Sequence, residues 1–195
     1  AWEYATAYTY PNSAITMDVA STDSANDNGY TVRIIGLDAN YNIISEDITI
    51  PATTTKAFFR INDVIYFNTD GNQGLITVSN GGTVYAAIRI GDGRNQASIY
   101  TVPAGHCFYL YRIDAFSNDS TSSKTGLFKN FTRNSSGHTF NVARTTFQNQ
   151  MNIQRRLPFK YDEKTDIQFQ LKTKSGTHEM NVFGEGVLVN EELDD

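Results

Sequence analysis

A succession of short strand-like runs, separated by turn signals, most constrains what this chain can fold into. Residues 31–50 are the clearest example, because two such runs flank the turn segment Gly-Leu-Asp-Ala-Asn-Tyr-Asn at residues 36–42. Strands are predicted at residues 15–19, 30–35, 43–50, 58–67, 75–78, 84–90, 97–102, 107–115, 124–128, 139–147, 151–157, 167–171 and 181–189. This spacing, about 8 to 14 residues with no long helical period, predicts an all-β protein, an antiparallel β-sandwich of jelly-roll type with room for a small extra β-lobe or insertion.

Side-chain alternation within the runs supports strands that are half buried. In residues 30–35, Tyr30, Val32 and Ile34 share one face of an extended chain, while Thr31 and Arg33 share the other. The 12 Phe and 11 Tyr, with only 19% charged residues, also favour pleated surfaces over helices. One apolar face per strand is the pattern of a sheet that packs on another sheet.

The chain is expected to have one main domain with short extensions. Residues 1–12 are predicted to be an extended N-terminal arm, residues 13–190 the β-sandwich domain, and residues 191–195 an acidic tail. Residues 117–136 are rich in Ser, Thr and Asn and are predicted to be an exposed insertion. Such an insertion either carries contacts with a partner or only connects strands, and its composition does not decide between the two.

The N-terminal arm is unusually aromatic. Trp2, Tyr4, Tyr8 and Tyr10 fall on one face if the segment is extended. One interpretation is an arm that adds to the edge of a neighbouring molecule's sheet, with its side chains filling alternate pockets. The other is an ordinary first strand in the chain's own core.

No motif for catalysis or metal binding is found. Cys107 is the only cysteine and is expected to be a small buried hydrophobic residue. His106, His138 and His178 lack a second histidine at metal-binding spacing, and there is no G-x-S-x-G elbow. Residues 23–29 resemble a calcium loop in composition but not in spacing, and an Asx-rich turn is expected there. No catalytic residue, metal ligand or cofactor is assigned, and the chain is not expected to be an enzyme.

The charge pattern narrows the classes of partner. A formal net charge of −5 argues against nucleic acid, and Arg155-Arg156 is too short to form a basic stripe. No run of 18 apolar residues occurs, so no membrane partner is expected. Tyrosines can stack on sugars, but the only tryptophan is Trp2, so glycan binding is kept as an alternative.

Several sequence blocks together carry a family resemblance. They are residues 32–41 (VRIIGLDANY), 45–50 (SEDITI), 59–62 (FRIN), 76–78 (ITV), 99–105 (IYTVPAG), 163–167 (EKTDI) and 186–189 (GVLV). In order and spacing they resemble β-rich virion structural proteins of marine tailed bacteriophages. The chain departs from that family at residues 51–55, where an Asn-Gly type of turn is usual, and at residues 117–136, which have no counterpart.

The resemblance implies a component of a phage particle. The expected role is a capsid decoration (cement) protein or head-attached subunit in the virion, which binds the major capsid protein or other virion proteins. The alternative is a tail or fibre component that binds a receptor or glycan. A homotrimer is expected, because three copies suit the local three-fold sites of an icosahedral shell. The candidate contact residues are Trp2, Tyr4, Tyr8, Tyr10, Asn118, Asn130 and Asn134.

Overall fold

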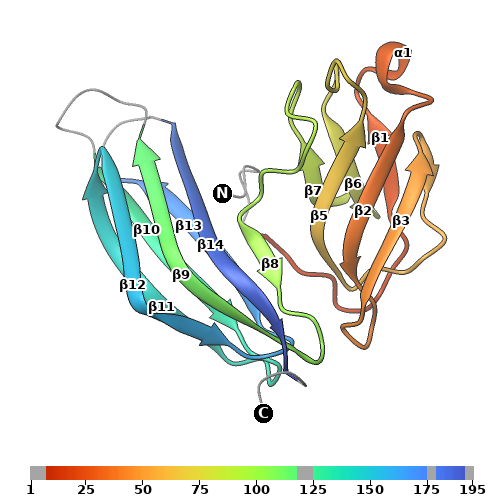
Figure 1. The fold of residues 1–195 in the computed structure, drawn as a ribbon. Coiled ribbons are helices and arrows are strands. Elements are labelled where there is room, and N and C mark those ends of the chain that lie inside the picture. The colour runs from red at the N-terminus through yellow and green to blue at the C-terminus, as the bar shows by residue number, and fades with distance from the viewer. Residues whose placement is uncertain (1–7, 118–124, 175–178, 192–195) are drawn as a thin grey trace. The chain divides into compact units, whose positions relative to one another are not determined.

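The computed structural model describes residues 8–117, 125–174 and 179–191, and it is all-β apart from the four-residue helix α1 (Ser24–Asp27) and a single 3₁₀ residue (Figure 1). The chain divides into two compact units, Trp2–Ala97 and Ser98–Asp195. Each unit has its own hydrophobic core. The all-β prediction is confirmed, but the strands expected in one domain over residues 13–190 are shared between two sandwiches.

The N-terminal unit packs a four-stranded sheet against a three-stranded sheet. The sheet orders are β4-β1-β6-β7 and β3-β2-β5, and all pairs are antiparallel. Its strands are β1 (Asp18–Ser21), β2 (Thr31–Leu37), β3 (Ile43–Thr49), β4 (Ala52–Thr53), β5 (Arg60–Phe67), β6 (Ile76–Asn80) and β7 (Thr83–Ile88). Val32 and Ile34 of β2 are fully buried and pack with Val19 and Val78 of the facing sheet. The apolar side chains of the alternation predicted from the sequence therefore point into this core.

The turn between β2 and β3, which carries part of the family resemblance, is held by Asp38. Its Oδ1 accepts hydrogen bonds from the backbone N–H groups of Asn40 (2.8 Å) and Asn42 (2.9 Å). Tyr41 adopts a positive φ of 67° within the turn. A carboxylate that bonds to the backbone two and four residues later is a common way to close a tight turn. This block therefore specifies a hairpin.

The C-terminal unit is also a sandwich of four strands on three. The sheet orders are β11-β10-β13-β8 and β12-β9-β14. Its strands are β8 (Ile99–Thr101), β9 (His106–Ser117), β10 (Thr125–Arg133), β11 (Thr139–Gln148), β12 (Gln150–Tyr161), β13 (Asp166–Thr173) and β14 (Met180–Asn190). The antiparallel pairs β8–β13, β9–β12 and β10–β11 are nested one inside the next, while β14 adds to the free side of β9. Nested pairs are a feature of jelly rolls, but the additional strand leaves the jelly-roll topology a prediction.

The exposed insertion expected at residues 117–136 is wrong for residues 125–133. They form β10, an inner strand of the four-stranded sheet, and Phe128 is fully buried in the core with Phe169, its centroid 5.9 Å away. The strand predicted at residues 124–128 is confirmed, but the polar residues on both sides of it concealed that it continues to Arg133 and is buried by the hydrophobic effect. Residues 118–124 of the expected insertion lie outside the described residues.

Candidate interaction surfaces

Cys107, His106 and His138 are of the residue types most often used in catalysis and metal binding, and the contacts that they make are structural. Within residues 8–117, 125–174 and 179–191, no group of three or more His, Cys, Asp or Glu side chains is arranged to hold a metal ion. Cys107 is fully buried, as predicted. His106 Nδ1 lies 2.8 Å from the carbonyl oxygen of Ala104, and the backbone N–H of His138 donates to Asn134 Oδ1 (2.9 Å). His178 lies outside the described residues.

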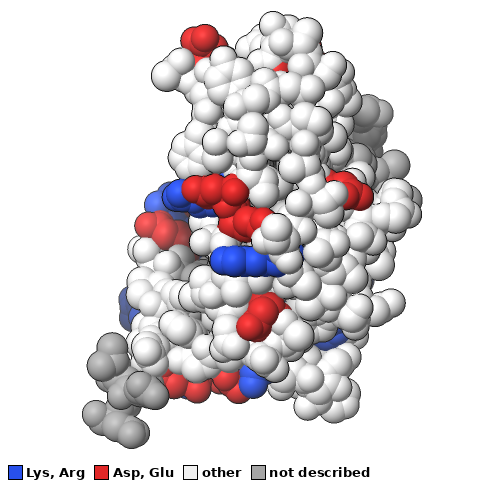
Figure 2. Space-filling model, turned by 90° about the vertical axis from the view of Figure 1, so that its right-hand side faces the viewer, with Lys and Arg blue, Asp and Glu red and all other residues white. Residues whose placement is uncertain are grey.

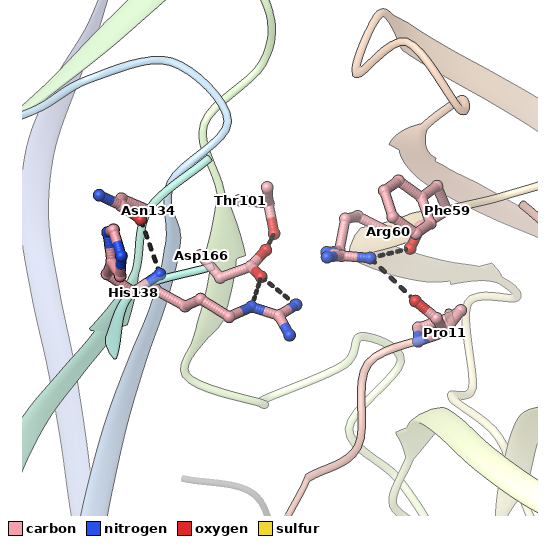
Figure 3. Close-up of polar contacts among 8 residues, drawn as sticks. Pro11, Phe59, Arg60, Thr101, Asn134, His138 and Asp166 are labelled. Carbon is pink, nitrogen blue, oxygen red and sulfur yellow. Dashed lines mark hydrogen bonds and ion pairs between the residues drawn. The ribbon is translucent and has the colours of Figure 1, made fainter. Parts of the chain in front are cut away.

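Arg60 holds the described end of the N-terminal arm against its own unit. Arg60 is only 3% exposed. Its guanidinium lies 4.8 Å from the ring centroid of Tyr10 and 4.0 Å from that of Phe59. Its Nη1 donates hydrogen bonds to the carbonyl oxygens of Pro11 (3.2 Å) and Phe59 (2.8 Å), as Figure 3 shows. A buried guanidinium is stabilised both by cation–π contacts with aromatic rings and by the hydrogen bonds that it donates. Residues 10–11 are therefore anchored intramolecularly.

Tyr8 and Tyr10 were expected to contact a neighbouring molecule, but in the structure they contact their own chain. Tyr8 is 9% exposed and meets Tyr10 edge to face, with ring centroids 4.7 Å apart. Both tyrosines thus pack on their own chain, but residues 8–11 do not form the ordinary first strand of the other interpretation. Trp2 and Tyr4 lie outside the described residues, and their role stays a prediction.

Of the asparagine candidates, the structure contradicts Asn130 and leaves the contact roles of Asn134 and Asn118 predictions. Asn130 is wrong as a contact residue, because it is 1% exposed and its Nδ2 donates to the Tyr161 hydroxyl (2.5 Å) in the core. Asn134 closes the β10–β11 turn, since its backbone N–H donates to the carbonyl oxygen of His138 (3.0 Å). Asn118 lies outside the described residues.

Asp27 is a buried carboxylate with a full set of donors. Its Oδ1 accepts from the backbone N–H of Gln73 (2.8 Å) and the Tyr66 hydroxyl (3.2 Å), and its Oδ2 accepts from the Gly74 N–H (2.8 Å) and the Ser21 hydroxyl (2.5 Å). Burial raises the pKa of Asp27, but these hydrogen bonds lower it by more, so the net pKa lies below its ordinary value. The residue ties α1 to the loop before β6. Where an Asx-rich turn was expected, at residues 23–29, the chain forms α1 with Asp23 as its N-cap.

A second buried acid, Asp166, ties three strands of the C-terminal unit together. Its Oδ1 accepts from the Thr101 hydroxyl of β8 (2.7 Å), and its Oδ2 accepts from Arg133 of β10 at 3.0 and 2.6 Å (Figure 3). Asp166 is 3% exposed, so removing Thr101 or Arg133 would leave its carboxylate poorly solvated and short of a hydrogen-bond donor. The geometry is that of a structural ion pair.

The sheet β12-β9-β14 presents an apolar strip on its outer face. Phe116 of β9 and Phe183 of β14 stack with centroids 5.8 Å apart, although they are 36% and 46% exposed. Val187 on β14 is 52% exposed. We call these three residues the β14 strip. β14 is an edge strand, and Glu185 is its only charged residue. Long edge strands with so little charge are templates for further strand pairing.

A polar network adjoins the β14 strip. Asp114, 2% exposed, accepts a hydrogen bond from Asn152 Nδ2 of β12 (2.5 Å) and pairs with Arg112 Nε of its own strand (2.6 Å). Arg112 Nη1 also lies 3.9 Å from Glu185 Oε2 of β14. Register places Phe183 directly opposite Asp114. Sequence reasoning missed this surface, because only strand pairing brings its residues together.

Charges on the face shown in Figure 2 are of mixed sign, with Lys and Arg side chains beside Asp and Glu. In the N-terminal unit, Arg33 makes two contacts with Asp47 (2.6 and 2.7 Å) and Arg94 two with Asp63 (3.0 and 2.6 Å). None of the helices described is long and apolar enough to cross a membrane. No protein-family model, curated protein or solved structure matches this chain.

Proposed function

We propose that this chain is a non-enzymatic structural protein of a phage virion, a decoration protein that binds the capsid surface and associates with copies of itself. The observation that carries the proposal is the β14 strip, an exposed apolar surface along an edge strand of a rigid sandwich. The resemblance of the sequence blocks to phage virion proteins supports the same role.

The physics of β14 favours association. Its inner face carries Gly184, where a Cβ would overlap the Phe169 ring, so the strand lies close against the opposite sheet at this point, while Phe183 and Val187 remain exposed. Exposed apolar groups of this kind are stabilised by burial, at about 25 cal/mol per Å² of apolar area. A stable interface needs about 800 Å² per partner, so the strip serves as the centre of a larger contact.

The self-association is proposed to be trimeric. Three copies related by a three-fold axis form a closed ring in which each copy offers one surface and receives another. Such a ring would cover the three unpaired edges and match the local three-fold positions of an icosahedral shell.

A receptor- or glycan-binding component of the tail or a fibre is the second candidate. It is favoured by the position of the Phe116–Phe183 stack beside Arg112, Asp114 and Asn152, because apolar ring faces next to hydrogen-bonding groups suit sugars. Phenylalanine lacks the polar edge of tryptophan and tyrosine, which makes this the weaker of the two readings.

Copy number per purified particle, measured by quantitative mass spectrometry relative to the major capsid protein, tests the proposal. Hundreds of copies would support the decoration role. About a dozen copies would move the protein to a tail or vertex and favour the receptor role. Absence from washed particles would overturn both.

A further inference from the structure

Basic residues are concentrated in one part of an otherwise acidic chain. Residues 125–161 contain six Lys or Arg and no Asp or Glu, although the whole chain has a net charge of −5. This stretch forms β10, β11 and β12 of the C-terminal unit. The sequence alone showed only the Arg155-Arg156 pair as a local cluster, and strand pairing is needed to see what the other cations form.

Register brings three cations together on the four-stranded sheet. Lys129 of β10 lies directly opposite Arg144 of β11. Lys172 of β13 lies opposite Leu127, which is two residues before Lys129 on β10. Phe128 is buried in the core, so its neighbour Lys129 points to the outer face. Arg144 and Lys172 are exposed and Lys129 is half-buried. We call Lys129, Arg144 and Lys172 the basic face.

The basic face has no acidic partner in the part of the chain that the structure describes. Other arginines of this protein are paired: Arg33 with Asp47, Arg94 with Asp63 and Arg133 with Asp166. No ion pair or hydrogen bond links the side chains of the basic face to any described residue. Cross-strand neighbours have Cβ atoms about 5 Å apart, and like charges placed directly opposite each other destabilise a sheet. An external anion would remove this cost.

We propose that the basic face binds a carboxylate-rich surface of a partner protein. The inference rests on the proposed function and names the chemistry of the surface to which the protein docks. Charge complementarity supports it, because three unpaired cations on a sheet surface present separate positive charges to separate carboxylates. A phosphate polymer is disfavoured, because strong binding to it depends on the release of many condensed counterions, and three cations release few.

The test measures binding of the full chain to immobilised poly-L-glutamate at several salt concentrations. Wild type should bind, with affinity falling as salt rises, and the variant K129Q/R144Q/K172Q should bind at least tenfold more weakly. The control variant R33Q/K56Q/R94Q removes the same charge from the other unit, where Lys56 is an exposed residue between β4 and β5. It should stay within twofold of wild type. The charge-preserving variant K129R/R144K/K172R should also bind.

Several results would overturn the inference. They are no binding by wild type, an equal loss in both glutamine variants, or loss of binding in the charge-preserving variant. Tighter binding of duplex DNA or dextran sulfate through the same three residues would replace the protein partner with an anionic polymer. A lower melting temperature for K129Q/R144Q/K172Q would show that the cations serve folding. Each of these outcomes leaves the copy number in particles unaffected, so failure here is distinguishable from failure of the decoration role.

Discussion

Replacing Asp27 with alanine should unfold the N-terminal unit far more readily than its place on a four-residue helix suggests. The change leaves the Gly74 N–H and the Tyr66 hydroxyl buried without their acceptor, and the Gln73 N–H and Ser21 hydroxyl partly so. A buried donor without a partner costs about 1–3 kcal/mol, so we expect a loss of about 3 kcal/mol in the free energy of unfolding.

The matched control is Asp23→Ala on the same helix. Asp23 is the N-cap, and its carboxylate accepts from the Asn26 N–H (3.2 Å) and Asn26 Nδ2 (2.9 Å) in an exposed position. Losing an exposed cap costs about 1 kcal/mol. Hydrogen exchange by mass spectrometry, read on peptides from β5 and β6 in the full chain, reports the N-terminal unit alone. Equal losses in the two variants, within about 0.5 kcal/mol, would refute the hydrogen-bonding argument.

The pH dependence of the same residue has a defined sign. The pKa of Asp27 is lowered below its ordinary value of 3.8, so its folded state holds the proton less tightly than the unfolded state does. The stability that it contributes is therefore fully present above pH 3.8 and is lost as pH falls through the lower folded pKa. Wild type should destabilise in this acidic range more steeply than D27A, and parallel curves would contradict the assignment.

Three further outcomes are expected. Phe128→Ala should cost the C-terminal unit about 3–5 kcal/mol, measured by hydrogen exchange in β13, because it empties a core position; a loss under about 1 kcal/mol would contradict the burial of β10. Arg60→Met, which keeps much of the side-chain volume, should speed exchange of residues 8–11 while leaving β6 protected, and unchanged exchange would show that Arg60 is not the anchor. F183D/V187D should convert an oligomer to a monomer in light scattering without lowering the melting temperature, whereas the control Ile43→Asp, 53% exposed on edge strand β3, should leave the oligomer intact.

Local patterns in the sequence were sufficient to locate most of the strands. Val32 and Ile34 alternate with polar residues, and turn signals such as Asn80-Gly81-Gly82 bound the runs, so each predicted run coincides at least in part with an observed strand or, at residues 15–19, with a bridge leading into β1. The short β4 and α1 were missed, because two and four residues do not produce a period. The boundary after Ala97 was also missed, since residues 94–98 lack the Gly or Pro that usually marks a linker.

The candidate surfaces depend on contacts between distant parts of the chain. Asp27 receives two of its hydrogen bonds from residues 46 and 47 positions later, and no local pattern reports them. Whether β14 lies at an edge or in the middle is decided by sheet order, which the sequence of one strand does not carry. The aromatic arm looked like a contact surface because aromatic residues serve interfaces and cores equally well, and Arg60, which fixes Tyr10, is about fifty residues away.

The β14 strip and the basic face lie on different sheets of the same sandwich, which makes their roles separable. Phe116, Phe183 and Val187 belong to β12-β9-β14, whereas Lys129 and Lys172 belong to β11-β10-β13-β8. The two outer faces lie on opposite sides of the hydrophobic core, which fills the space between the sheets. A substitution on one outer face should therefore not alter the other outer face. F183D/V187D should abolish self-association but retain binding to poly-L-glutamate, and K129Q/R144Q/K172Q should do the reverse. If monomers bind poly-L-glutamate tenfold more weakly, binding depends on several copies acting together, and the two surfaces are then parts of one multivalent contact.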